Sequence, residues 1–403
     1  MGMMGALLCS CHFGKSADEM INRYNDVERE LTFSFEVAQP GGGETRVSLE
    51  DLELNGVRSL WERTDVLSLF DFGQVFITTN GGGRKAMSLS YVEPADEDPN
   101  DGIDYAIFQG SGLAKMGDEV YNSKTFALAY PATYFGDLSC SSTQANLLFS
   151  GQDGTLFTIG RVYQYAWGRA TGICQDRVVT LYEDQSECSS HLDWHPHALG
   201  SDRIVLDNKM CVIRFSMVCG KPAVGSTDTT WMTLQTYLKS QRLEIASIDV
   251  ANLNSPEPGM GETQLNLQTG EVTPLVGADT FLTVVPLDTL KEIMEENATP
   301  DSFDPDARRV AWGSTFYLAV PCPTSTQLNI RPLLTVKTRS AEDHHTPGPT
   351  YFGLLRSKTV KEGDYYMTAP VRMVDDKTRL VEEAKIYLYY HSSFVWDIPI
   401  DIY

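Results

Sequence analysis

The segment with the clearest capacity for chemistry is a run of imidazole and carboxylate side chains at residues 191–197. It contains, in order, His191, Asp193, His195 and His197. In an extended chain alternate side chains point to one side, so the four groups would face the same way, and imidazole with carboxylate suits zinc. The proline within the run and the two serines before it instead favour an exposed loop. A metal-dependent enzyme that uses this segment is therefore one alternative function.

Other chemical motifs fail on spacing. The glycine run that begins at Gly81 lacks the spacing and the hydroxyl of a phosphate-binding loop, and the sequence contains no GxSxG or HExxH motif. The acidic loop at residues 96–104 misses the EF-hand pattern, which would place Pro99 and Phe108 at ligand positions. We therefore predict no catalytic, cofactor-binding or metal-binding residue and no cofactor, and we classify the chain as a non-enzyme.

The N-terminus carries a partial signal for lipid attachment. Removal of Met1 would expose Gly2, but Ala6 stands where N-myristoylation wants Ser or Thr. Cys9 and Cys11 could carry the second acyl chain that a lone myristate needs for stable attachment. We identify Gly2, Cys9 and Cys11 as candidate lipidation sites, with membrane contact through this end. The alternative is an apolar arm that packs under a neighbouring subunit.

Charge and composition exclude several classes of protein. The 403-residue chain carries 32 basic and 54 acidic side chains, a net charge of −22. Proteins that coat nucleic acid need clustered Lys and Arg, so direct nucleic-acid binding is not expected. No apolar run approaches the roughly 18 to 20 residues of a membrane-spanning helix. Eight cysteines without a CxxC pair fit a reducing interior better than a disulfide scaffold.

Strand patterns dominate the chain. Residues 31–38 alternate, which places Phe33 and Phe35 on one face. Asp153-Gly154 between two apolar runs predicts a β-hairpin, and Thr269-Gly270 repeats the pattern. Further strands are predicted at 177–183, 203–218, 240–249, 309–321, 327–337, 364–374 and 384–391.

Helical spacing occurs in two places. One predicted helix starts after Asn55 or Gly56 and spans about three turns, and the other runs from Pro286 to Asn297. The whole pattern predicts a mainly β fold, an antiparallel sandwich or jelly roll with long loops and two or three short helices, in one domain or two. The predicted domain limits are as follows: an N-terminal arm at 1–30, a jelly-roll-like sandwich at 31–225, a second β-rich domain or a continuation of the same sandwich at 226–393, and an extended tail at 394–403.

Residues 31–403 resemble viral jelly-roll capsid proteins in their aromatic-rich strands, long Gly/Pro/Asp loops and C-terminal strand with its tail, and Gly2 resembles a myristoylated capsid N-terminus. The resemblance implies a structural shell subunit in a virion, and in the host cytoplasm during assembly. It also implies partners that are copies of the chain or other capsid proteins. The missing basic arm points to an outer or minor component.

The tail has a pattern suited to assembly. Apolar residues alternate with other residues at a chain end, where polar disorder is the norm, so the tail would bury one face on another subunit. Its members are Val395, Trp396, Ile398, Ile400, Ile402 and Tyr403.

A second alternative function is a carbohydrate- or receptor-binding β-sandwich. It would use exposed aromatic rings as stacking platforms, with Trp167, Trp194 and Trp231 as the candidates.

Overall fold

The computed structural model describes most of the chain between residues 28 and 391. The described ranges are 28–38, 49–51, 57–59, 64–72, 75, 85–92, 105–117, 124–183, 204, 206–222, 229–254, 262–275, 281–287, 289–294, 299–304, 311–323, 328–380 and 383–391. Strands predominate, and the helices within these ranges are short. The predicted mainly β architecture with a few short helices is therefore confirmed. No described helix is long and apolar enough to cross a membrane.

The N-terminal half forms a seven-stranded barrel. Its strands are β1 (Glu28–Ala38), β4 (Val66–Asp71), β5 (Met87–Val92), β6 (Tyr105–Lys115), β7 (Lys124–Tyr130), β9 (Ala166–Gln175) and β10 (Val178–Glu183). They pair in the order β1-β6-β5-β4-β7-β9-β10, and β10 returns to β1 in a parallel pair that closes the ring. Each of these strands has a neighbour on both sides, which removes the exposed edges of an open sheet.

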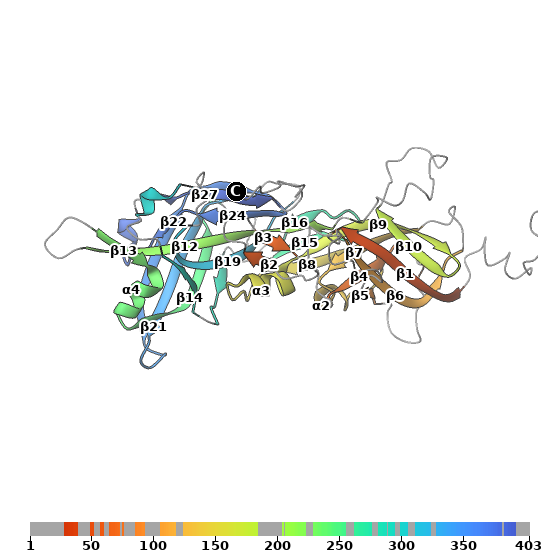
Figure 1. Cartoon of the computed structure of the whole chain (residues 1–403), viewed down its shortest axis with the longest axis horizontal. Helices are drawn as coiled ribbons and strands as arrows, with labels where there is room; N and C mark the ends of the chain where they lie inside the picture. Colours follow the sequence, from red (N-terminus) through yellow and green to blue (C-terminus); the bar gives the residue numbers. More distant parts are fainter. Residues whose placement is uncertain are drawn as a thin grey trace, which may run out of the picture.

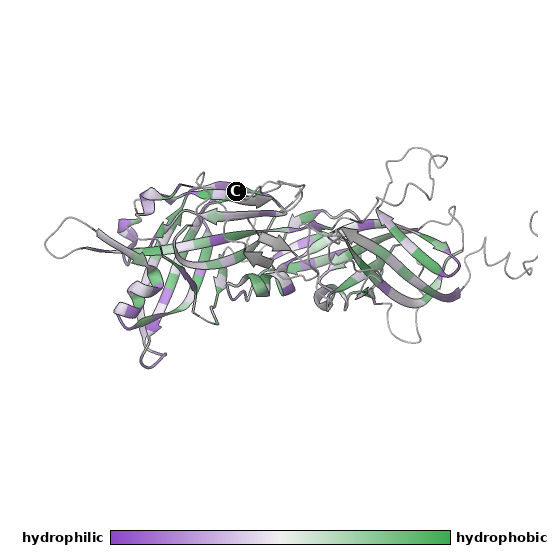
Figure 2. Cartoon of the chain, in the orientation of Figure 1, coloured by the Kyte–Doolittle hydropathy of each residue, from purple (hydrophilic) through white to green (hydrophobic). Residues whose placement is uncertain are grey.

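The barrel interior is filled by the alternate residues of its strands. Leu31, Phe33 and Phe35 of β1 are buried, as the alternation in the sequence predicted. Phe33 meets Phe126 edge to face, and Phe35 stacks on Phe108 with 5.8 Å between ring centroids. Such aromatic pairs add to the stabilisation that burial provides. Figure 2 shows hydrophobic residues along these strands and along those of the C-terminal half.

The C-terminal half forms a β-sandwich. One sheet contains β18 (Lys291–Ile293), β19 (Gly313–Pro321), β12 (Met210–Pro222), β24 (Asp364–Thr368) and β27 (Ile386–His391), with β13 (Thr229–Thr233) and β25 (Val371–Arg372) also paired to β12. The other contains β17 (Phe281–Val284), β14 (Leu243–Asn252), β21 (Pro332–Ser340), β22 (Pro347–Leu355) and β26 (Glu383–Ala384). Buried residues of both sheets belong to one hydrophobic cluster, which makes them two layers of a common core.

Smaller elements complete the fold. They are the paired strands β2 (Leu49–Asp51) and β3 (Val57–Ser59), the paired strands β20 (Leu328–Ile330) and β23 (Lys358–Val360), and the helices α2 (Ala132–Phe135) and α4 (Leu234–Ser240). Thr233 caps the N-terminus of helix α4, and its side chain accepts a hydrogen bond from the Thr236 N–H. The sequence predicted no helix there.

A small sheet joins the two lobes at the waist of the elongated molecule (Figure 1). Strand β8 (Gln144–Leu148) from the first half pairs with β15 (Glu262–Asn266) from the second, and β15 pairs with β16 (Val272–Pro274). An edge-to-face series of Phe70, Phe135, Tyr165 and Phe149 belongs to the same buried cluster as the sandwich core. The two lobes therefore share buried apolar surface rather than only a linker.

The second predicted hairpin is confirmed and the first is wrong. β15 and β16 pair around a turn in which Gly270 has a positive φ of 73°. After Asp153-Gly154, by contrast, the chain enters helix α3 (Leu156–Thr158) instead of a strand. The reason is that the Asp153 carboxylate accepts hydrogen bonds from the Thr155 N–H and the Thr158 hydroxyl, so it organises the start of a helix.

Both predicted helices are also wrong where the structure describes them. Residues 57–59 form the strand β3 and residues 66–71 form the strand β4. Residues 291–293 form β18, which pairs with β19. Apolar residues spaced three and four apart in short segments suit either element, and here pairing with a neighbouring strand overrides the local pattern.

The predicted domain limits stay a prediction. They assign residues 31–225 to one domain, yet β12 ends at Pro222 and pairs with β19 and β24 of the sandwich. Just before it, β11 (Asp207–Asn208) pairs with β9 of the barrel. These pairings favour a limit close to Lys209.

Replacement of Gly270 should weaken the waist. A Cβ at this position would lie 2.4 Å from the Trp167 ring, and the positive φ adds backbone strain. We expect Gly270→Ala to lower the free energy of unfolding by about 3 kcal/mol. Gly151 also has a positive φ but more space, since its nearest neighbour would be 3.4 Å away, so Gly151→Ala should cost about 1 kcal/mol. Urea unfolding measures both, and equal losses would contradict the role of the Trp167 contact.

Candidate functional site

Most residues that the sequence singled out lie outside the described ranges. This applies to the 191–197 segment, to Gly2, Cys9 and Cys11, to Trp194, and to the whole tail at 394–403. Their predicted roles stay predictions. Within the described ranges, no group of three or more His, Cys, Asp or Glu side chains is placed to hold a metal ion.

Two of the three candidate tryptophans, Trp167 and Trp231, lie in the described ranges, and neither is an open stacking platform. Trp167 is only 7% exposed, and its indole N–H donates a hydrogen bond to the Leu267 carbonyl at 2.9 Å. Trp231 is half-buried, with Gly220 against its ring and the Arg372 guanidinium 5.0 Å from the ring centroid. The expectation that Trp167 is an exposed platform is wrong, because the ring fills the space between the barrel and the small sheet.

An exposed apolar turn stands out at the waist. Helix α3 continues into a π-helical turn, η2 (Ile159–Tyr163), in which the Gln164 N–H donates to the Ile159 carbonyl at 2.8 Å. Phe157 is 57% exposed and Val162 is also exposed. The Arg161 guanidinium lies 4.3 Å from the centroid of the Phe157 ring. Single π-helical turns are rare and occur often at functional sites.

A second exposed apolar segment runs beside the start of this turn. The Val285 N–H donates to the Gln152 carbonyl at 3.1 Å, and both Val285 and Leu287 are exposed, Leu287 to 80%. The buried side chain of Gln152 is fixed in turn, because its amide donates to and accepts from the backbone of Ala319 at 2.8 Å. A rigid backbone therefore presents these apolar side chains to solvent.

We refer to the exposed residues of these two segments as the waist patch. The hydrogen bond between the Val285 N–H and the Gln152 carbonyl brings the two segments together, and groups of exposed apolar side chains commonly mark interaction sites. The sequence pattern did not separate Phe157, Val162 and Leu287 from core residues, because the wrong hairpin at Asp153-Gly154 placed the first two in a strand and the wrong helix after Pro286 placed Leu287 on its apolar face. The members of the waist patch are Phe157, Arg161, Val162, Val285 and Leu287.

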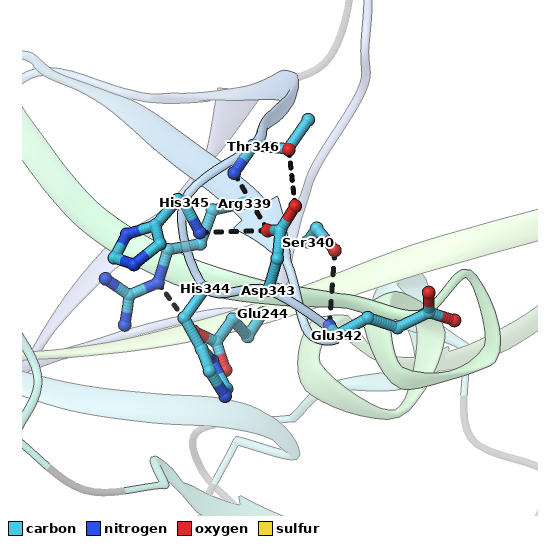
Figure 3. A network of polar contacts seen from close by, with 8 residues as sticks. All are labelled: Glu244, Arg339, Ser340, Glu342, Asp343, His344, His345 and Thr346. Atoms are coloured by element: carbon cyan, nitrogen blue, oxygen red, sulfur yellow. Dashed lines mark hydrogen bonds and ion pairs between the residues drawn. The ribbon is translucent and has the colours of Figure 1, made fainter.

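The hairpin between β21 and β22 forms a second ordered surface (Figure 3). The Asp343 carboxylate accepts hydrogen bonds from the Thr346 hydroxyl at 2.5 Å and from the N–H groups of His345 and Thr346 at 2.9 Å. Glu244 of β14 lies 2.9 Å from the His344 ring and 2.5 Å from the Arg339 side chain. An exposed loop is thus held in one conformation.

These contacts shift the pKa values of both carboxyl groups downward. The Thr346 hydroxyl and then the His345 N–H hold the pKa of Asp343 well below its ordinary value. The hydrogen bond with His344, followed by the one with Arg339, lowers the pKa of Glu244. In both cases hydrogen bonds favour the ionised form.

The low pKa of Asp343 predicts the acid stability of the hairpin. Since the pKa is depressed in the folded state, the stabilisation is complete above the ordinary value of 3.8 and is lost only as the pH falls toward the folded value. An NMR titration of the Asp343 carboxyl carbon should therefore have its midpoint well below pH 3.8. Thr346→Val removes the hydroxyl donor and should move the midpoint upward. A midpoint at the ordinary value in the unaltered protein would contradict the hydrogen-bonded turn.

The described cysteines are buried free thiols. They are Cys140, Cys174, Cys211, Cys219 and Cys322. Burial, with a smaller effect from Asp375, raises the pKa of Cys219 to about 12. Burial and a hydrogen bond with Cys211 raise the pKa of Cys322. Because the thiolate is the reactive form, these buried side chains serve as small hydrophobic groups.

The burial of these thiols limits the reactivity of the folded protein. Five of the eight cysteines are buried and free, so at most three should react with a water-soluble disulfide reagent at pH 8. Unfolding in guanidinium chloride should expose all eight. Reaction of four or more thiols in the native state would contradict the buried positions.

Comparison with known proteins gives similarity only at the level of structure. No family model and no curated protein matches the sequence. A proposed cell adhesion protein from Bacteroides ovatus has 12% identity and a TM-score of 0.43, over 92% of this chain and 100% of that one. A C-terminally truncated tip fimbrial protein from Porphyromonas gingivalis has 10% identity and a TM-score of 0.35, over 89% and 99%. A fimbrial protein from Bacteroides vulgatus has 9% identity and a TM-score of 0.36, over 80% and 91%.

The three structures named above are of a proposed cell adhesion protein and two fimbrial proteins, all from bacteria. The resemblance to viral capsid proteins is therefore wrong, and so is the shell function that it implied. The predicted location in a virion and in the host cytoplasm is also wrong, and so is the prediction that capsid proteins are the partners. Aromatic-rich strands, long loops and an alternating apolar segment occur in many β-proteins, so they do not identify a capsid protein.

Proposed function

We propose that the chain is a non-enzymatic subunit of an adhesive or fimbrial assembly on a bacterial surface, and that it assembles with other subunits of that structure. We choose an adhesive or fimbrial assembly because the structurally similar proteins are named as cell adhesion and fimbrial proteins. The observation that carries the proposal is the waist patch, because a stable surface of exposed apolar side chains suits a binding partner better than it suits water.

The composition of the tail at 394–403 complements this patch. It combines the apolar residues of its alternating pattern with two carboxylates, Asp397 and Asp401. The waist patch combines apolar side chains with the guanidinium of Arg161. In this proposal the tail of one subunit lies on the patch of the next, in an open head-to-tail contact that repeats along a fibre.

A head-to-tail contact also accommodates the strong acidity of the chain. Subunits with a net charge of −22 repel one another, so association needs apolar burial that outweighs the repulsion. Screening by salt reduces the repulsion but leaves the apolar contact intact. This proposal is compatible with the alternative of a carbohydrate- or receptor-binding β-sandwich. An adhesive subunit would bind its partners through the exposed surfaces of its sandwich lobe.

Deletion of residues 394–403 tests the proposal. The truncated chain should stay folded and monomeric, while the full chain should form oligomers that light scattering on a size-exclusion peak detects. A synthetic peptide of residues 394–403 should bind the truncated chain and fail to bind when Phe157→Ser and Val162→Ser are combined. Equal assembly of the truncated and full chains would overturn the proposal.

A matched pair of tail variants separates the apolar face from the charge. Replacement of Ile398 and Ile400 by Ser removes part of the alternating face and should abolish assembly. Replacement of Asp397 and Asp401 by Asn keeps that face and should weaken assembly by only a few-fold, because exposed ion pairs contribute little. A larger loss from the second variant would show that charge, rather than apolar burial, drives the contact.

A further inference from the structure

A buried cation lies where the chain passes from the barrel to the sandwich. Lys209 stands between β11 and β12, and it is only 3% exposed. Lysine is almost never fully buried unless it is paired, because an ammonium group loses its hydration when it leaves water. Its position at the change from one lobe to the other therefore calls for a physical explanation.

The contacts of Lys209 come from both lobes. Its Nζ atom lies 3.7 Å from a carboxylate oxygen of Asp207 and 3.7 Å from one of Glu362. It also lies 5.5 Å from the centroid of the Trp167 ring. Trp167 belongs to β9 of the barrel, whereas Glu362 precedes β24 of the sandwich. The backbone N–H of Lys209 donates to the Tyr165 carbonyl at 2.7 Å, which fixes the residue to the barrel side.

The ring beneath the ammonium group is itself fixed. The indole N–H of Trp167 is bonded to the Leu267 carbonyl, and Gly270 lies directly against the ring. Both belong to the turn that follows β15 in the small sheet. Lys209 thus makes contact with an immobilised barrel residue on one side and a sandwich carboxylate on the other.

We propose that Lys209 is a pin that fixes the orientation of the barrel relative to the sandwich. Rotation of one lobe against the other would separate the ammonium group from the Glu362 carboxylate or from the Trp167 ring while it remains buried. An unpaired buried charge is strongly unfavourable. The free energy of the chain is therefore lowest in one orientation of the lobes and rises as they rotate away from it. Lys209 acts here as a positioning residue. This inference concerns the single chain and does not depend on the proposed assembly.

The test measures the spread of distances between the lobes in the full chain. Spin labels on noncanonical residues at the exposed positions 113 and 345 report one site on the barrel and one on the sandwich, and they leave the cysteines untouched. The unaltered chain should give one narrow distance distribution by pulsed electron resonance. Lys209→Met keeps the apolar stem and removes the charge, and it should broaden the distribution at least twofold. An unchanged width would overturn the proposal.

Two further variants make the result decisive. Lys85→Met breaks the exposed ion pair of Lys85 with Asp137 and should leave the width unchanged. Glu362→Gln removes only the sandwich charge, so it decides the question if Lys209→Met fails to fold: broadening supports the pin, and an unaltered width refutes it. A residue with a merely stabilising role would lower the melting temperature without broadening the distribution.

Discussion

The pairing of β8 with β15 is the constraint on which the rest of the waist depends. It aligns Leu148 with Glu262 at one end and Gln144 with Asn266 at the other. A strand from the first half of the chain thereby becomes part of a sheet with strands from the second half. The turn after β15 then accepts the hydrogen bond of Trp167, and this ring lies beside the buried Lys209. Backbone hydrogen bonds set the geometry, and side chains then make it specific.

The sequence predicted those features of the fold that depend on interactions between residues close together in the chain. The alternation that buried Phe33 and Phe35 is visible within a few residues, and so is the turn at Gly270. The closure of the barrel is not, because Thr32 pairs with Val178, far along the chain and in a parallel direction. The Asp153-Gly154 turn was misread because its carboxylate could serve either a hairpin or a helix start, and only the contact with Thr158 decides between them.

The candidate sites were harder to predict than the fold. Phe157 and Val162 look like core residues in the sequence, and only their position on a π-helical turn at the waist exposes them. Lys209 looks like an ordinary surface residue, and its burial follows from contacts with Trp167 and Glu362 that are remote in sequence. At the waist, apolar residues are exposed and a lysine is buried, which is the reverse of what residue type predicts. The reason is that exposure there is set by how the two lobes meet.

The parallel closure of the barrel by β1 and β10 also bears on how the chain acquires its structure during synthesis. Translation produces β1 first and its closing partner β10 only after all the other barrel strands. Until then the apolar side chains Leu31, Phe33 and Phe35 have no complete interior to enter. Pairings of such wide separation are slow to form and leave strands open to aggregation. A nascent chain of this kind is therefore most exposed to aggregation in the interval before the last strand of the barrel has left the ribosome.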